Sequence, residues 1–347
     1  MHASMIKILA ALVVAALAPA AVAQDTPAEL KVPDVAGINL EGVDYPFEVK
    51  THSFESQRQT LEMAYMDVAP AEGTEAKGTV LLLHGKNFNG AYFGQTAGDL
   101  AKAGYRVVIP DQIGFGKSSK PEHYHYTFHQ LAANTLGLLE DLGVDKPVVL
   151  GHSMGGMIAT RFVLDFPERS AGLVLLNPIG LEDWRSFGVP YQTVEQWYES
   201  ELKKTRDGIK AYQQESYYDG KWDAKYDLWV DLLAAPLESP DYPRLAWNQA
   251  LTYDMIFTQP VVYEFDQIEV PTLLIIGTRD RTALGKAHVD DDTRATMGQY
   301  QELGKTTAER IPGAEFVELE GVGHLPHIEA YDRFIGPLTR WIGEFEK

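Results

Sequence analysis

The chain has 347 residues, a formal net charge of −19 and no cysteine. Such an acidic protein is poorly suited to attract nucleic acid or an anionic membrane, and without cysteine its stability depends on a buried core rather than on disulfides. A chain of this length can bury that core in one large domain, or in one domain with an insertion.

The first 23 residues have the pattern of a secretory signal peptide. Lys7 gives a positive start, residues 8–17 are apolar, and Ala21-Val22-Ala23 offers the small residues that a signal peptidase reads. We therefore expect cleavage before Gln24 and export to the periplasm or the medium. The apolar stretch is shorter than a bilayer span, and no other segment is long and apolar enough, so we expect no stable membrane insertion.

The next segment, residues 24–42, is rich in proline, alanine and acidic residues and is expected to form an extended arm. Beyond it, short apolar runs of Val, Ile and Leu alternate with helical patterns, as in a parallel sheet whose strands are buried on both faces. The predicted strands are residues 45–54, 60–68, 78–83, 106–109, 147–150, 171–176, 271–276 and 314–319. The predicted helices are residues 91–103, 128–142, 154–166 and 330–345.

A long insertion, residues 179–268, interrupts this alternation between two predicted strands. Its pattern is mostly that of amphipathic helices, and it is crowded with tryptophan and tyrosine. We expect it to form a lid over the end of the sheet. Most of its aromatic side chains would pack inside the lid, and a few would line a pocket.

The segment Gly151-His152-Ser153-Met154-Gly155 lies between a predicted strand and a predicted helix. A G-x-S-x-G element in this context is typical of a nucleophile elbow, a tight turn that exposes the serine hydroxyl. Glycine is needed on either side because the strand and helix backbones nearly touch. The turn would also direct the Met154 backbone N–H toward the reacting centre. An ordinary glycine-rich turn is the alternative, and the flanking strand and helix favour the elbow.

A serine hydroxyl needs a base, usually a histidine that a carboxylate holds in one tautomer. Asp280 follows the seventh predicted strand, and His324 follows the last one within a glycine-rich loop. Both would lie at the carboxyl ends of parallel strands, where such sheets place their sites. Glu182 and Asp183 are alternative acids and His327 is an alternative base, but the local glycine patterns favour Asp280 and His324.

The order Ser153, Asp280, His324 resembles that of the α/β-hydrolase superfamily, in its lid-bearing branch, over roughly residues 45–347. The resemblance implies an α/β fold with a mostly parallel eight-stranded sheet, helices on both faces and a helical lid. It also implies this division of the chain: a hydrolase core of residues 43–178 and 269–347, and a lid of residues 179–268.

Two further motifs carry the resemblance. His84-Gly85-Lys86-Asn87 resembles the H-G-x motif, which implies that the backbone N–H groups of Lys86 and Met154 form an oxyanion hole. The family often has proline or glycine where Asn87 stands, so a side-chain role for Lys86 or Asn87 stays open. Residues 111–119 resemble the structural D-x-x-G-x-G-x-S turn and lack the spacing of a phosphate-binding loop.

No metal or organic cofactor is expected. The run Asp290-Asp291-Asp292 beside His288 could suggest a metal site, but no ligand spacing recurs elsewhere, which favours a solvated acidic loop. His84 and His152 are expected to shape the loops beside the site.

These patterns predict an exported serine hydrolase that cleaves a small apolar or aromatic ester or lactone through an acyl-enzyme. The resemblance makes dehalogenase and epoxide-hydrolase activity unexpected, because those branches use aspartate where Ser153 stands. Peptidase activity ranks lower, because the sequence departs from the G-G-S-W-G of proline iminopeptidases. Carbon–carbon bond hydrolysis and cofactor-free perhydrolysis remain alternatives. So does a non-catalytic binding protein on a hydrolase fold, although a complete triad argues against it.

Overall fold

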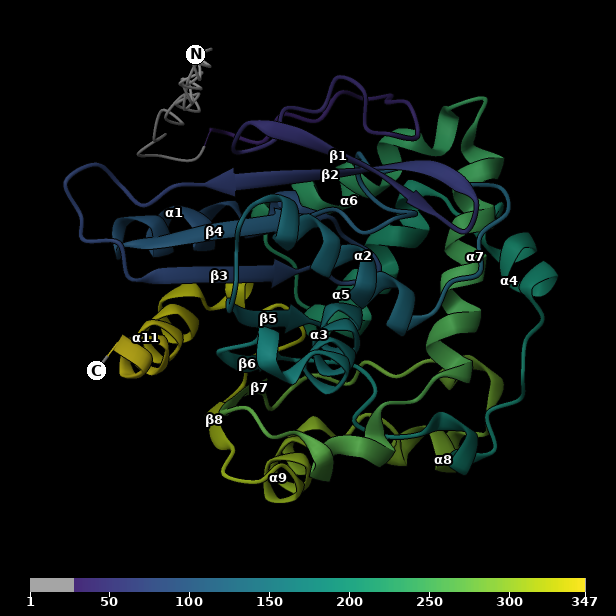
Figure 1. The fold of residues 1–347 in the computed structure, drawn as a ribbon. Helices are drawn as coiled ribbons and strands as arrows, with labels where there is room; N and C mark the ends of the chain where they lie inside the picture. The colour runs from purple at the N-terminus through teal and green to yellow at the C-terminus, as the bar shows by residue number, and fades with distance from the viewer. Residues whose placement is uncertain (1–27, 347) are drawn as a thin grey trace, which may run out of the picture.

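The computed structural model describes residues 28–346, so the predicted signal peptide lies outside the described residues. Eight strands form one sheet in the order β1-β2-β4-β3-β5-β6-β7-β8 (Figure 1). β1 pairs antiparallel with β2, and β2 pairs antiparallel with β4, whereas every other neighbouring pair is parallel. This confirms the predicted mostly parallel eight-stranded sheet.

The predicted strands correspond one to one with those of the sheet, with small shifts at their ends. The first begins at Val49 rather than at residue 45, because pairing with the second strand starts only there. Their turn is shorter than predicted: Ser56 already pairs with Gln59, and the two residues between them have positive φ angles of 50° and 67°. The strands are β1 Val49–Ser56, β2 Gln59–Val68, β3 Gly78–Leu83, β4 Tyr105–Pro110, β5 Val148–His152, β6 Gly172–Leu176, β7 Thr272–Gly277 and β8 Glu315–Leu319.

The helices include two, α8 and α9, in a region where the sequence patterns predicted no element. α9 buries only Tyr300, Gly304 and Thr307, so its apolar stripe is too narrow to stand out in the sequence. The helices are α1 Gly94–Lys102, α2 Phe128–Asp141, α3 Met154–Asp165, α4 Val194–Glu201, α5 Arg206–Tyr218, α6 Asp227–Ala234, α7 Tyr242–Thr258, α8 Asp291–Thr296, α9 Tyr300–Arg310, α10 Pro326–Glu329 and α11 Tyr331–Ile342.

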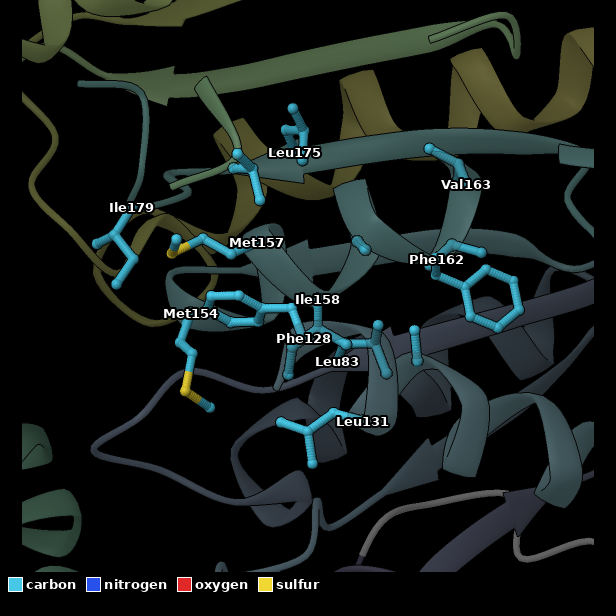
Figure 2. Close-up of a cluster of buried hydrophobic side chains, with 14 of the residues drawn as sticks. Leu83, Phe128, Leu131, Met154, Met157, Ile158, Phe162, Val163, Leu175 and Ile179 are labelled. Carbon is cyan, nitrogen blue, oxygen red and sulfur yellow. The ribbon is translucent and has the colours of Figure 1, made fainter. Parts of the chain in front are cut away.

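Helices cover both faces of the sheet because successive strand residues point to opposite sides. In β3, Leu81 and Leu83 belong to a core cluster with residues of α2 and α3, whereas Leu82 belongs to a second cluster with residues of α1 and α11. Figure 2 shows part of the first cluster, with Phe128 of α2 and Ile158 of α3 beside Leu83. This packing holds α3, the helix that follows Ser153, rigidly against the sheet.

Residues 179–268 contain α4 to α7, of which α4 packs on α7 and α5 packs on α6. In Figure 1, α4 and α7 lie beyond the end of the sheet to which β3 points. The N-terminal segment reaches this region, since the Ala36 backbone N–H donates to the Ala235 carbonyl at 2.9 Å. No helix among residues 28–346 combines the length and the apolar character needed to cross a bilayer.

Candidate active site

Ser153 sits at the turn between β5 and α3 in a strained conformation. Its φ of 57° and ψ of −123° lie outside the regions that L-residues commonly occupy. The backbones around it are so close that only glycine fits. A Cβ at Gly151 would lie 2.1 Å from the Gly155 carbonyl oxygen, and a Cβ at Gly155 would lie 2.1 Å from the Leu83 carbonyl oxygen. The local structure is therefore a nucleophile elbow.

The structure brings Ser153, His324 and Asp280 into one hydrogen-bonded chain. The Ser153 hydroxyl lies 3.0 Å from Nε2 of His324, and Nδ1 of His324 lies 2.6 Å from Oδ2 of Asp280. Asp280 and His324 are fully buried, whereas 7% of Ser153 stays exposed. With Nδ1–H donating to the carboxylate, Nε2 is free to accept the serine proton.

Two groups that sequence reasoning missed hold the Asp280 carboxylate. The Asn177 side-chain amide donates to Oδ2 at 2.8 Å, and the Thr282 backbone N–H donates to Oδ1 at 2.8 Å. Asn177 also accepts the Gly277 backbone N–H at 3.0 Å, which ties the end of β6 to the end of β7. Its position directly after β6, at the same sheet edge as Ser153, is the signal that could have identified it.

His152 links the loop of His324 to the loop after β3. The Gly85 backbone N–H donates to the Tyr92 hydroxyl at 2.9 Å, and that hydroxyl lies 2.8 Å from Nδ1 of His152. Nε2 of His152 lies 2.8 Å from the His324 carbonyl oxygen, so a neutral His152 with its proton on Nε2 completes the chain. Burial, together with His327 and His324, holds the pKa of His152 well below its usual range, which keeps it neutral.

The loop after β3 passes directly beside the nucleophile. A Cβ at Gly85 would lie 2.9 Å from Cβ of Ser153 and 3.4 Å from its hydroxyl oxygen. The next residue, Lys86, makes no backbone N–H hydrogen bond to another described residue, and the Met154 N–H belongs to the first turn of α3, where helices leave such groups unpaired. Both donors stay available for an oxyanion.

The Lys86 and Asn87 side chains, whose roles the sequence left open, both contact side chains of the segment 179–268. Lys86 is only 7% exposed. Its Nζ donates to Oε1 of Gln249 at 2.9 Å and lies 3.5 Å from the centre of the Tyr253 ring. Asn87 donates to the Tyr217 hydroxyl at 2.8 Å, and the Tyr217 ring stacks on the His324 ring at 4.7 Å. Burial lowers the pKa of Lys86 to about 7, although Glu201 opposes this shift.

A cavity of about 730 Å³ opens onto the Ser153 hydroxyl. The segment 179–268 contributes the aromatic side chains of Trp197, Tyr212 and Tyr253 to its wall. A neighbouring chamber of about 360 Å³ shares the Tyr212 and Tyr253 walls and extends beneath α5. The chamber therefore adjoins the cavity at Tyr212 and Tyr253, whereas Ser153 lines only the larger cavity.

The alternative residues lie apart from this chain of hydrogen bonds. Glu182 accepts the Gly298 backbone N–H, and Asp183 pairs with Arg185. His327 is buried, neither of its ring nitrogens forms a hydrogen bond to a described residue, and burial lowers its pKa to about 3. Asp290 caps α8, and no cluster of potential metal ligands occurs within residues 28–346.

The turn that begins at Asp111 is structural in its contacts. The Asp111 carboxylate accepts hydrogen bonds from the Tyr45 hydroxyl at 2.8 Å, the Gly90 backbone N–H at 2.7 Å and the Lys117 backbone N–H at 2.8 Å. Gly116 has a φ of +50°, and a Cβ there would lie 2.0 Å from the same carboxylate. The turn thereby holds Tyr45 of the N-terminal segment and the helical turn at Gly90, and none of residues 111–119 lines the cavity.

Comparison with known proteins agrees with this architecture. The family model for the alpha/beta hydrolase fold matches residues 78–331. The chain belongs to the α/β hydrolase fold family. This hydrolase is similar to a protein from Pseudomonas aeruginosa PAO1 described as a probable hydrolytic enzyme. The two share 50% identity and a TM-score of 0.86, over 91% of this chain and 99% of that one.

Two curated relatives indicate the range of chemistry in the family. Lipase 1 of Psychrobacter immobilis is 24% identical over 86% of this hydrolase and 88% of its own length. A 2-hydroxy-6-oxononadienedioate/2-hydroxy-6-oxononatrienedioate hydrolase of Comamonas testosteroni is 26% identical over 58% of this hydrolase and 71% of its own length. The fold thus has both lipase and carbon–carbon hydrolase homologues.

Proposed function

We propose that this hydrolase cleaves a carboxylic ester or a lactone by nucleophilic catalysis at Ser153. One observation carries the proposal: a serine at a strained elbow lies 3.0 Å from Nε2 of a buried histidine, whose Nδ1 lies 2.6 Å from a buried carboxylate. This arrangement activates a hydroxyl that is otherwise a weak nucleophile. The cavity beside it gives a small substrate access to the hydroxyl oxygen.

In the first half of the reaction, the Ser153 oxygen attacks the carbonyl carbon while Nε2 of His324 takes the hydroxyl proton. The Asp280 carboxylate stabilises the imidazolium that forms. The backbone N–H groups of Lys86 and Met154 donate to the negative oxygen of the tetrahedral intermediate. Each such donor is typically worth about 3 kcal/mol in the transition state. Collapse of the intermediate expels the alcohol, which takes its proton from His324, and leaves an acyl group on Ser153.

In the second half, His324 removes a proton from water, which attacks the acyl carbon. The second intermediate expels the Ser153 oxygen, which recovers its proton from His324. The products are a carboxylic acid and an alcohol, or a hydroxy acid if the substrate is a lactone. The aromatic wall of Trp197, Tyr212 and Tyr253 supports a substrate with an apolar or aromatic part.

A second candidate is the hydrolysis of a carbon–carbon bond next to a ketone. The similarity to the Comamonas testosteroni hydrolase favours it. Release of methanol from methyl esters, without cleavage of 1,5-diketones, would support ester hydrolysis. The reverse result would support carbon–carbon hydrolysis.

We also propose that the protein is exported, on the pattern of residues 1–23. Expression in a bacterial host should yield a periplasmic or secreted product. Its intact mass should be that of a chain whose first residue is Gln24. A cytoplasmic product that retains residues 1–23 would contradict export without affecting the proposed chemistry.

The mechanism is tested by intact mass spectrometry after exposure to a fluorophosphonate. The wild type should gain one adduct, Ser153→Ala should gain none and should lose turnover, and Ser200→Ala should behave like the wild type. Ser200 is the matched control because it is a second serine that lines the cavity. An adduct on Ser153→Ala, or ester turnover by that variant at the wild-type rate, would refute the mechanism.

A further inference from the structure

The cavity beside Ser153 is basic, although the whole chain carries a net charge of −19. Lys86, Arg281 and Lys286 contribute to its wall, and Glu215 is the one acidic side chain among the lining residues. Arg294 also lines it but is neutralised by an ion pair with Asp291 at 2.9 Å. If charged residues were placed at random on such an acidic protein, the cavity wall would contain more acidic than basic side chains.

The three cations have neutral hydrogen-bond partners, whereas other cations among the described residues, such as Arg106 and Arg161, pair with carboxylates. None of them has a carboxylate oxygen of a described residue within ion-pair distance. Lys86 donates to the Gln249 amide. Arg281 donates to the carbonyl oxygens of Thr278 at 2.9 Å and of Asp280 at 2.6 Å. Lys286 donates to the Arg281 carbonyl oxygen at 2.6 Å. Their positive charge is therefore not cancelled locally.

Three carboxyl groups near these cations do not neutralise them, because two are paired with other residues and the third has a raised pKa. Glu201, beside Lys86, pairs with Lys204 at 2.7 Å. Glu182, whose charge acts on Lys286, has its pKa raised by burial, and the Asp280 carboxylate is occupied by His324. Burial also lowers the pKa of Lys286. An anion in the cavity would offset that cost and hold the lysine charged.

The wall that carries Arg281 lies next to the candidate triad. Thr282 lines the cavity directly after Arg281. Thr282 follows Asp280 by two residues, and its backbone N–H donates to that carboxylate, so this wall adjoins the candidate triad.

We propose that the cavity binds a substrate that carries a carboxylate, which Arg281 and Lys286 hold. In the reaction proposed above, on which this inference rests, the substrate is then the ester or lactone of a molecule with a second, free carboxylate. The free carboxylate orients the scissile carbonyl over Ser153.

The test measures binding to the Ser153→Ala variant, which cannot complete the proposed reaction. Calorimetry compares the monomethyl esters of succinic, glutaric and adipic acid with their dimethyl esters, which differ only in the free carboxylate. We expect at least one monomethyl ester to bind about tenfold more tightly than its dimethyl counterpart, the size of one charge-assisted hydrogen bond. Raising the NaCl concentration from ~0.05 M to ~0.5 M should weaken that preference.

Substitutions test which residues cause the preference for the monomethyl ester. Lys286→Met and Arg281→Gln, each in the Ser153→Ala background, should reduce it at least about threefold and leave dimethyl ester binding unchanged. Lys146→Met is the matched control, because this lysine is exposed and precedes β5, at the far end of the strand from Ser153. The salt series needs no further substitution, so it decides the question even where a cavity variant folds poorly.

Equal affinities for both members of all three pairs, or a preference that salt does not alter, would overturn the inference. Methanol release by the wild type tests the proposed function separately. Turnover of mono- and dimethyl esters with equal kcat/KM would leave the mechanism standing and remove the carboxylate site. Tight, salt-sensitive binding without turnover or phosphonate labelling would support the carboxylate site and refute the proposed mechanism.

Discussion

Ser153 shows at the scale of one residue how this fold uses strain. Its positive φ of 57° is costly for a residue with a Cβ, yet the strand before it and the helix after it leave no other path. The cost is offset by the core that packs α3 onto the sheet. As a result, the hydroxyl projects from the turn toward Nε2 of His324.

This strain predicts a difference between two inactive variants. Ser153→Gly and Ser153→Ala both remove the hydroxyl, but only glycine adopts the elbow conformation without a Cβ penalty. We expect Ser153→Gly to be about 1 kcal/mol more stable than Ser153→Ala. Urea unfolding followed by circular dichroism measures this difference. An alanine variant at least as stable as the glycine variant would show that the elbow is unstrained.

At the scale of elements, the site is assembled from loops that follow β3, β5, β7 and β8, and the loops after β3, β5 and β8 share further hydrogen bonds. Tyr92 and His152 join them, since one hydrogen-bonded chain runs from the Gly85 backbone N–H to the His324 carbonyl oxygen. Neither side chain takes part in the proposed bond-making steps. Their contribution is to hold the loop after β3 and the loop that carries His324 in a fixed relation.

Tyr92→Phe tests this connection, because it keeps the ring and removes both hydrogen bonds of the hydroxyl. We expect kcat to fall about tenfold or more with little change in KM, since small displacements of catalytic groups are costly. Tyr331→Phe is the control: it removes a hydroxyl hydrogen bond to Asp99, remote from the cavity, at 2.8 Å. The control should lose about 1 kcal/mol of stability and no activity. A kcat for Tyr92→Phe equal to that of the wild type would contradict this role.

At the scale of the whole molecule, buried neutral histidines should make the fold sensitive to acid. His327 packs among the rings of Tyr92, Phe93, His152 and Phe334, and burial lowers its pKa to about 3. The unfolded chain, with a histidine pKa near 6.5, binds a proton that the folded chain rejects. The neutral His327 therefore does not lower the free energy of unfolding above about pH 6.5. Below that pH, this free energy decreases as the pH falls toward 3.

From pH 7 to pH 5, His327 alone should cost roughly 2 kcal/mol of unfolding free energy. His327→Leu should remove that part of the loss, whatever its effect on packing at pH 7. His123→Leu, at an exposed histidine, should leave the pH dependence unchanged. Chemical denaturation at the two pH values measures all three proteins. The prediction fails if His327→Leu loses as much stability between pH 7 and pH 5 as the wild type.

The charge distribution also acts at this scale. The acidic surface repels anions at long range, whereas the cavity is proposed to bind a carboxylate inside, where side chains shield it from solvent. High salt should therefore weaken binding in the cavity while it relieves the long-range repulsion. The cations of the cavity are closer to the bound carboxylate than the surface charges are, so the attraction dominates and high salt should weaken the proposed carboxylate preference.

The sequence by itself determined the family and the fold class, because both follow from short-range patterns. Continuous apolar runs predict strands that are buried on both faces, and the glycines at 151 and 155 allow the backbone contact of an elbow. The order of Ser153, Asp280 and His324 pointed to one family. Element ends shifted where pairing and capping, rather than hydrophobicity, decide them, as at Val49.

Only the tertiary structure decided which polar groups meet in space. Asn177 holds Asp280 across 103 positions of the chain, and the Lys86 side chain reaches Gln249 across 163. The basic wall of the cavity likewise joins residues from the loops after β3 and β7, none of which forms a motif along the chain. The physical reason is that a motif records only what its own backbone requires. A charge is functional or ordinary according to the partner that folding places beside it.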